Sequence, residues 1–206
     1  HKVYGTYNKT QVSENTSDIE FYSMNVLEDV NVDFLPDSLE GLIYCPGTIN
    51  LKPFTRIKAA DFLSDFDLQV GGAVKVIQVV LPRLKAAGHS SIVLFSTVAV
   101  QTGLPFHTQV SASKGAIEGL AKSLAAEFAP KIRVNCIAPS LTDTPLASML
   151  LNNDQKKEAN AERHPLKRIG TTQDIANMAE FLVSDKASWI TGQIMHVDGG
   201  MSTVKS

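Results

Sequence analysis

Short apolar runs alternate with longer amphipathic stretches along the whole chain, and this alternation constrains the fold more than any other feature of the sequence. Six runs rich in β-branched and apolar residues are bounded by turn residues: 2–7, 19–24, 41–45, 91–96, 132–138 and 193–197. Short strands that are apolar on both faces are typical of a parallel sheet covered by helices on each side.

Three stretches between these runs predict helices, at residues 65–87, 112–128 and 172–184. The second has one apolar stripe at helical spacing, made of Ile117, Leu120, Ala121, Leu124, Ala125 and Phe128. Thr171 and Asp174 are suited to cap the start of the third. Strands joined through helices predict a doubly wound α/β fold with a parallel sheet. Since no repeat, linker or low-complexity segment interrupts the pattern, residues 1–206 are expected to form a single domain.

The charge balance limits the kinds of binding partner that can be expected. Lys and Arg number 19 against 21 Asp and Glu, a net charge of −2, which gives no reason to expect a nucleic-acid partner or an anionic membrane surface. No run is long enough to span a membrane, and no signal peptide is visible. The two cysteines, Cys45 and Cys136, fit a reducing cytosol. We therefore expect a cytoplasmic protein without a metal site.

Four segments carry a family resemblance: residues 91–97 (SIVLFST), 111–114 (SASK), 132–139 (IRVNCIAP) and 190–200 (ITGQIMHVDGG). In the residues of these segments and in the spacing between them, the chain resembles the short-chain dehydrogenase/reductase family. This resemblance implies a Rossmann-like fold that binds NAD(P). Relatives begin with a strand, a glycine-rich turn and a helix, and nothing here fits that pattern. Residues 2–7 align with the family's second strand. We therefore expect the first strand–turn–helix unit to exist in the natural protein upstream of His1, with its strand in the middle of the sheet.

The resemblance implies a catalytic set in which a tyrosine donates a proton to the developing alkoxide. Carried over residue by residue, Lys114 matches the family's lysine, Thr97 falls on its serine and Gln69 on its asparagine. The tyrosine position is occupied by Val110, which has no proton to donate. Loss of a general acid typically costs about 10²–10⁴ in rate, so ordinary carbonyl reduction needs a replacement.

His107 is the nearby titratable side chain suited to replace that acid, three residues before Val110. The alternative interpretation is an exposed loop histidine with no chemical role. Ser111 is adjacent but is expected to point elsewhere on the helix, and Tyr44, at a strand end, is a remoter candidate.

The cofactor positions come from the same resemblance. Asn8 and Lys9 follow the first strand, where relatives discriminate the adenosine ribose; the absence of an acid there favours NADP over NAD, unless Lys9 is simply solvated. Asn25 takes the position that contacts adenine. Gly47 is retained from the family's turn at the next strand end and permits close backbone approach to a ligand.

A second group of cofactor positions follows the fifth strand-like run. Pro139 ends that run, Ser140 replaces the family's glycine, and Thr144 matches a threonine that contacts the nicotinamide carboxamide in relatives. Thr142 and Thr144 are equally suited to cap a following helix. Lys114 would hold the nicotinamide ribose.

Two functions remain open from the sequence. One is an oxidoreductase that transfers hydride between NAD(P)(H) and a carbonyl or alcohol substrate at an atypical active site. The other is a catalytically impaired member that acts as a nucleotide-binding, regulatory or structural protein. A homodimer or homotetramer is expected, because small residues form one helix surface at Ala112, Gly115, Ala116 and Gly119, although such residues also serve packing within a subunit. Residues 140–163, which would shape the substrate site, carry no specific signature.

Overall fold

A computed structural model describes residues 2–10 and 15–205, and it confirms the six predicted strands to within two residues at each end. They are β1 Val3–Tyr7, β2 Ile19–Ser23, β3 Gly41–Ile43, β4 Ser90–Phe95, β5 Ile132–Pro139 and β6 Ile194–Val197. Every pairing between neighbouring strands is parallel. The α/β architecture expected from the alternating pattern is therefore present.

The strands form two sheets instead of one. β1 pairs with β2, and β3, β4, β5 and β6 form a four-stranded sheet in that order. Among the described residues, neither β1 nor β3 pairs along its other edge. Val3 on β1 and Ile43 on β3 are 46% and 42% exposed, high values for apolar strand residues in such a fold. The division falls where the family resemblance places an additional strand.

Helices connect the strands. A continuous run comprises α1 Ala59–Phe66, a π-helical segment η2 Asp67–Gly71 and α2 Gly72–Ala86; the others are α3 Ala99–Thr102, α4 Thr108–Phe128, α5 Asp154–Glu162 and α6 Thr172–Val183. Short 3₁₀ turns are η1 Phe54–Arg56, η3 Pro145–Leu150 and η4 Asp185–Ala187. Two helices begin earlier than the sequence predicted: the α1–α2 run at Ala59 instead of residue 65, and α4 at Thr108 instead of residue 112. The early turns of α1 and α4 are largely exposed or polar, so no apolar stripe marks them.

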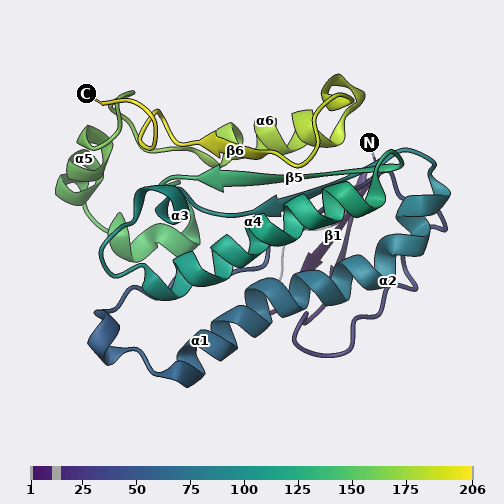
Figure 1. The fold of residues 1–206 in the computed structure, drawn as a ribbon, viewed down its shortest axis with the longest axis horizontal. Coiled ribbons are helices and arrows are strands. Elements are labelled where there is room, and N and C mark those ends of the chain that lie inside the picture. The colour runs from purple at the N-terminus through teal and green to yellow at the C-terminus, as the bar shows by residue number, and fades with distance from the viewer. Residues whose placement is uncertain (1, 11–14, 206) are drawn as a thin grey trace.

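The sheet separates two hydrophobic cores, because alternate strand residues point to opposite faces. Ile92 and Leu94 of β4 lie in the core that α2 and α4 cover, whereas Val93 lies in the core beneath α6. Figure 1 shows α4 and the long α1–α2 run on one side of β5 and α6 on the other. The carboxyl ends of the strands are left for the loops that form the site.

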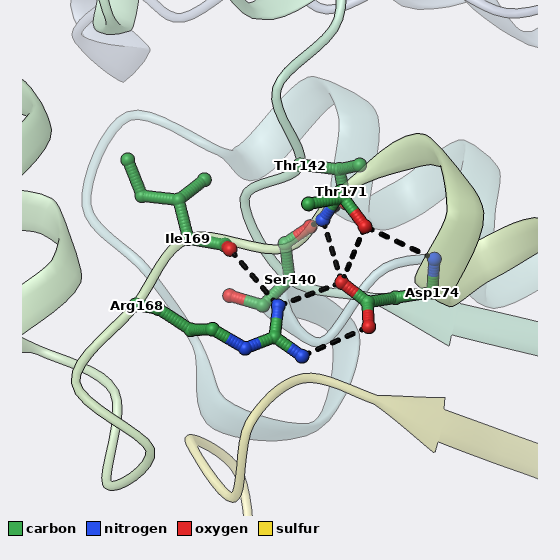
Figure 2. A network of polar contacts seen from close by, with 6 residues as sticks. All are labelled: Ser140, Thr142, Arg168, Ile169, Thr171 and Asp174. Atoms are coloured by element: carbon green, nitrogen blue, oxygen red, sulfur yellow. Dashed lines mark hydrogen bonds and ion pairs between the residues drawn. The ribbon is translucent and has the colours of Figure 1, made fainter.

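A polar clamp fixes the start of α6. Thr171 and Asp174 form the capping box predicted from the sequence, with the Asp174 amide donating to Thr171 Oγ1 at 3.2 Å and the Thr171 amide to Asp174 Oδ2 at 2.7 Å. Arg168 adds a bidentate contact at 2.7 and 2.8 Å (Figure 2). Arg168, followed by the Thr171 hydrogen bonds, holds the pKa of Asp174 well below its usual range. Beside the clamp, the Gly170 amide donates to the Leu141 carbonyl at 3.1 Å, which ties α6 to the loop after β5.

Candidate functional site

A cavity of about 1110 Å³ opens at the carboxyl ends of the four-stranded sheet. Most of the predicted site residues line it: Gly47, Thr97, His107, Val110, Lys114, Pro139, Thr142 and Thr144. Val3, Ile43 and Val183 also line it, so the cavity continues into the space between the two sheets. Asn8, Lys9, Asn25 and Gln69 are not among the described residues that form its wall.

Gln69 nevertheless reaches the site beneath Gly47. Its side chain is fully buried on the π-helical segment, and its Nε2 donates to Asp65 Oδ2 at 2.7 Å. Its Oε1 has no hydrogen-bond partner among the described residues. Both Gln69 Oε1 and Lys114 Nζ lie 3.5 Å from the place that a Cβ atom would take on Gly47. Beneath this turn, therefore, a buried acceptor without a partner among the described residues lies close to a cation on the cavity wall.

A buried carboxylate organises this part of the site. Asp65 is 5% exposed and accepts hydrogen bonds from Thr48 Oγ1 at 2.8 Å, Ser113 Oγ at 2.6 Å and Gln69 Nε2 at 2.7 Å. A buried charge needs such donors to offset its desolvation. Asp65, Ser113 and Thr48 are not among the site residues predicted from the sequence. The only available signal was the i, i+4 spacing of Asp65 and Gln69 in a helical stretch.

Lys114 places an ammonium group on the cavity wall. It makes no ion pair or hydrogen bond with any residue of the described ranges. Burial lowers the pKa of Lys114, and the nearby Cys136 and Asp65 oppose that shift in part. A desolvated ammonium on a cavity wall is available for an anionic or hydroxylic ligand.

The wall around Val110 contains two groups that can exchange protons. Thr97 Oγ1 accepts from the Ala99 amide at 3.3 Å, which leaves its hydroxyl proton free to donate. His107 is the N-cap residue of α4, and its Nδ1 lies 2.7 Å from the Pro105 carbonyl. Since a carbonyl only accepts, Nδ1 carries the proton and Nε2 is left for another partner. Val110 itself is 4% exposed, one helical turn before Lys114.

The hydroxyl groups of the other two candidates, Tyr44 and Ser111, donate to backbone carbonyls. Tyr44 is buried and donates its hydroxyl to the Leu68 carbonyl at 2.9 Å, and burial raises the pKa of Tyr44. It does not line the cavity. Ser111 donates to the Ala99 carbonyl at 3.4 Å. Because both hydroxyl protons are already used in these hydrogen bonds, neither Tyr44 nor Ser111 is positioned to replace the missing acid.

The residues expected to contact the adenosine half are not gathered at the cavity. Asn8 and Lys9 are exposed at the end of β1. Asn25 is used within its own turn, with Nδ2 donating to Glu28 Oε1 at 2.7 Å and Oδ1 accepting from the Leu27 amide at 3.1 Å. The structure therefore brings together the catalytic positions but not these three.

Thr142 and Thr144 line the cavity without capping a helix. Thr144 occupies the N-cap position of η3, but its side chain makes no capping bond. Its hydroxyl donates to the Thr142 carbonyl at 3.4 Å, and the Thr142 hydroxyl donates to the Ser140 carbonyl at 3.0 Å. The capping alternative from the sequence is thus not the arrangement observed.

Cys45 and Cys136 are both free thiols. Cys45 follows β3 and Cys136 lies on β5, and β4 separates these two strands. Among the residues that the structure describes, no helix is both long and apolar enough to cross a membrane.

Parallel strands covered by helices on both faces, with a cavity at the carboxyl ends of the strands, define a Rossmann-like fold. The sequence profile of a family described as enoyl-(acyl carrier protein) reductase matches residues 23–202. The chain belongs to the short-chain dehydrogenase/reductase family.

Individual relatives agree with this assignment. A tropinone reductase homolog of Arabidopsis thaliana is 39% identical over 157 residues, which cover 76% of this chain and 60% of the relative. A short-chain dehydrogenase family protein of Francisella tularensis superposes with a TM-score of 0.87 at 26% identity, over 99% of this chain and 89% of that one. ElxO with NADP bound superposes with a TM-score of 0.83 at 25% identity, over 91% and 79%. The chain spans about 60% of the length of the first two curated relatives that it matches.

Proposed function

We propose that this chain is part of an NAD(P)-dependent oxidoreductase that transfers hydride between NAD(P)(H) and a carbonyl or alcohol substrate. The observation that carries the proposal is the cradle under Gly47, where Gln69 Oε1 and Lys114 Nζ, neither of which has a partner within residues 2–10 and 15–205, converge. An orphaned acceptor beside a cation fits ribose hydroxyls, which both donate and accept hydrogen bonds. Family membership supports the same interpretation.

In this mechanism the nucleotide supplies the hydride, and the chain supplies position and protons. Lys114 and Gln69 hold the ribose hydroxyls, while Thr142 and Thr144 contribute hydroxyls on the opposite loop. Thr97 donates to the substrate oxygen and stabilises its developing negative charge. His107, when both of its ring nitrogens carry a proton, donates the proton of Nε2 in place of the missing tyrosine, while Nδ1 stays bound to the Pro105 carbonyl.

Steady-state reduction of a carbonyl panel by the complete protein, with NADPH, tests this function. Lys114→Met is expected to lower turnover by about 10²-fold or more, and His107→Gln by about 10²–10⁴-fold. The matched controls are Lys122→Met, an exposed lysine on the same helix, and His89→Gln, an exposed histidine. Equal turnover by the wild type and Lys114→Met would contradict the proposal.

A nucleotide-binding protein without turnover is the second candidate, and Val110 favours it because the usual proton donor is absent. Tight binding of NADPH by the complete protein, with no reduction of any carbonyl, would decide for it. For the nucleotide itself we propose NADP, since Asn8 and Lys9 provide no acid after β1 and ElxO is described with NADP bound. Fluorescence titration measures the affinity of the complete protein for NADPH and for NADH. NADPH should bind more tightly, and Lys9→Ala should reduce the difference between the two affinities.

We also propose that an additional parallel strand from an upstream strand–turn–helix unit fills the space between β1 and β3. Each of these strands has one edge that pairs with no other strand in the described part of the chain, and Val3, Ile43 and Val183 line the space between them. Unpaired edges and exposed apolar residues are costly. Residues 1–206 expressed alone should therefore lack a cooperative thermal transition, and a stable cooperative fold would contradict the idea.

For assembly we propose a homodimer or homotetramer in the cytoplasm, formed through the small-residue face of α4. A Cβ atom on Gly119 would meet nothing within 4 Å, and Leu63 and Phe66 on the neighbouring α1 are 73% and 46% exposed. Small residues permit close helix approach, and exposed apolar residues add area to bury. Light scattering on the complete protein should give a dimer or tetramer, with Gly119→Arg shifting it toward the monomer.

A further inference from the structure

Ser140 and His164 form a hydrogen-bonded pair outside the catalytic set described above. Ser140 follows the end of β5, and His164 follows α5, 24 residues later. The Ser140 hydroxyl lies 2.8 Å from His164 Nε2. Both residues line the main cavity, and both also line a smaller one of about 280 Å³ beside the start of α6.

The partner of the other ring nitrogen fixes the direction of this hydrogen bond. His164 Nδ1 lies 2.8 Å from the Asn160 carbonyl oxygen, which can only accept. In the neutral imidazole Nδ1 therefore carries the proton, and Nε2 accepts from the Ser140 hydroxyl. Met201 Sδ, 3.0 Å from the same oxygen, is the weaker acceptor. His164 is 3% exposed, so its ring orientation is held by packing as well as by these bonds.

A hydroxyl that donates to an imidazole, with the imidazole oriented by a third group, is the arrangement that activates a serine for nucleophilic attack. The backbone amide of Leu141, the next residue, donates to no acceptor in the described ranges. An amide directly after a nucleophile is suited to bind the oxyanion of a tetrahedral intermediate. The adjoining wall is apolar, with Leu141, Leu146 and Leu150.

We propose that Ser140 and His164 are a nucleophile and its general base, which accept the acyl group of an apolar carboxylic ester. Ser140 Oγ attacks the ester carbonyl carbon as its proton moves to His164 Nε2. The C–O bond to the leaving alcohol then breaks, and His164 returns the proton to the departing alkoxide. Water, deprotonated by His164, hydrolyses the acyl-serine to a carboxylic acid and restores the Ser140 hydroxyl. No oxidant, metal or nucleotide takes part, so this activity is independent of the proposed oxidoreductase.

A fluorophosphonate–biotin probe tests the pair directly on the complete protein without any nucleotide, with the adduct located by peptide mass spectrometry. The Ser140 peptide should carry the adduct, and Ser140→Ala should lack it. His164→Gln keeps a hydrogen-bonding side chain but no base, so labelling at Ser140 should slow by about 10²-fold or more. Ser148→Ala, at an exposed serine of η3, is the matched control and should label Ser140 at the wild-type rate.

Hydrolysis of p-nitrophenyl butyrate gives a second readout and should be lost in Ser140→Ala, a substitution that removes one hydroxyl and little else. Absence of the adduct from Ser140 would overturn the proposal, and so would equal labelling in wild type and a folded His164→Gln. Either result would leave the pair as a tie that holds the loop after α5 against β5. Failure of NADPH-dependent reduction would not affect these measurements.

Discussion

The acceptor Oε1 of Gln69 and the ammonium Nζ of Lys114 lie equally close, at 3.5 Å, to the space where Gly47 lacks a side chain. The two residues come from different helices, and they meet under the loop that follows β3, where Gly47 places no side chain between them and the cavity. This cradle is the part of the site on which the nucleotide proposal depends, and it leads to the first prediction.

Gly47→Ala should weaken nucleotide binding without destabilising the fold. The added Cβ would meet its neighbours at ordinary van der Waals distance, and Gly47 does not have a positive φ, so stability should hold. Loss of one hydrogen bond to a charged group costs about 1.5–3 kcal/mol, or about 10–100-fold in Kd. Titration of the complete protein with NADPH measures the change, and thermal unfolding is the control. Unchanged affinity would show that the ligand does not enter the cradle.

Val110→Tyr should raise carbonyl reduction by about 10²–10⁴-fold, because it places a phenol one helical turn before Lys114. The cavity beside Val110 has room for the larger ring. Val110→Phe is the matched control, since it adds the ring without the hydroxyl. Steady-state kinetics with NADPH measures the effect, and equal rates for the two variants would mean that the site lacks more than a proton donor.

Lys114 should make stability increase with pH in the alkaline range. Burial holds its pKa in the folded protein below the 10.5 of a free lysine, so between these values the unfolded state binds more protons. The wild-type free energy of unfolding should therefore rise relative to that of Lys114→Met as the pH increases toward 10.5. Urea titrations of the complete protein at several pH values measure it. Lys122→Met should follow the wild type, and a difference that stays constant with pH would refute the prediction.

Asp174, an anion, should make the free energy of unfolding decrease in the acid range. Its folded-state pKa lies below the usual 3.8, so its stabilisation is complete above that value and is lost as the pH falls through the folded-state pKa. Asp174→Asn should flatten the dependence of the melting temperature on pH below about 4. Asp37→Asn, at an exposed loop aspartate, should keep the wild-type slope. In addition, Thr171→Ala should cost about 1 kcal/mol at neutral pH, measured by urea unfolding, through loss of the cap.

The strands, the main helices and the Lys114 position could be predicted because each is encoded locally. Apolar runs mark the strands, and the serine–lysine segment opening α4 places Lys114. Asp65 with Ser113, 48 residues apart, and Ser140 with His164, 24 apart, could not be predicted. These hydrogen bonds form only when distant segments meet in the fold, and no local sequence pattern encodes such contacts. Asn25 illustrates the converse, since its position suggested a ligand contact but its own turn uses the side chain.

The division of the strands into a two-stranded and a four-stranded sheet also means that different parts of the molecule resist local unfolding to different degrees. β4 and β5 are paired along both edges and almost wholly buried, whereas β1 and β2 form a two-stranded ribbon, a unit that is marginal in water. Backbone amides in β4 and β5 should exchange with deuterium only on global unfolding, while those in the ribbon exchange far sooner. Asn8 and Lys9, which follow β1, would therefore sit on the least protected part of the described fold.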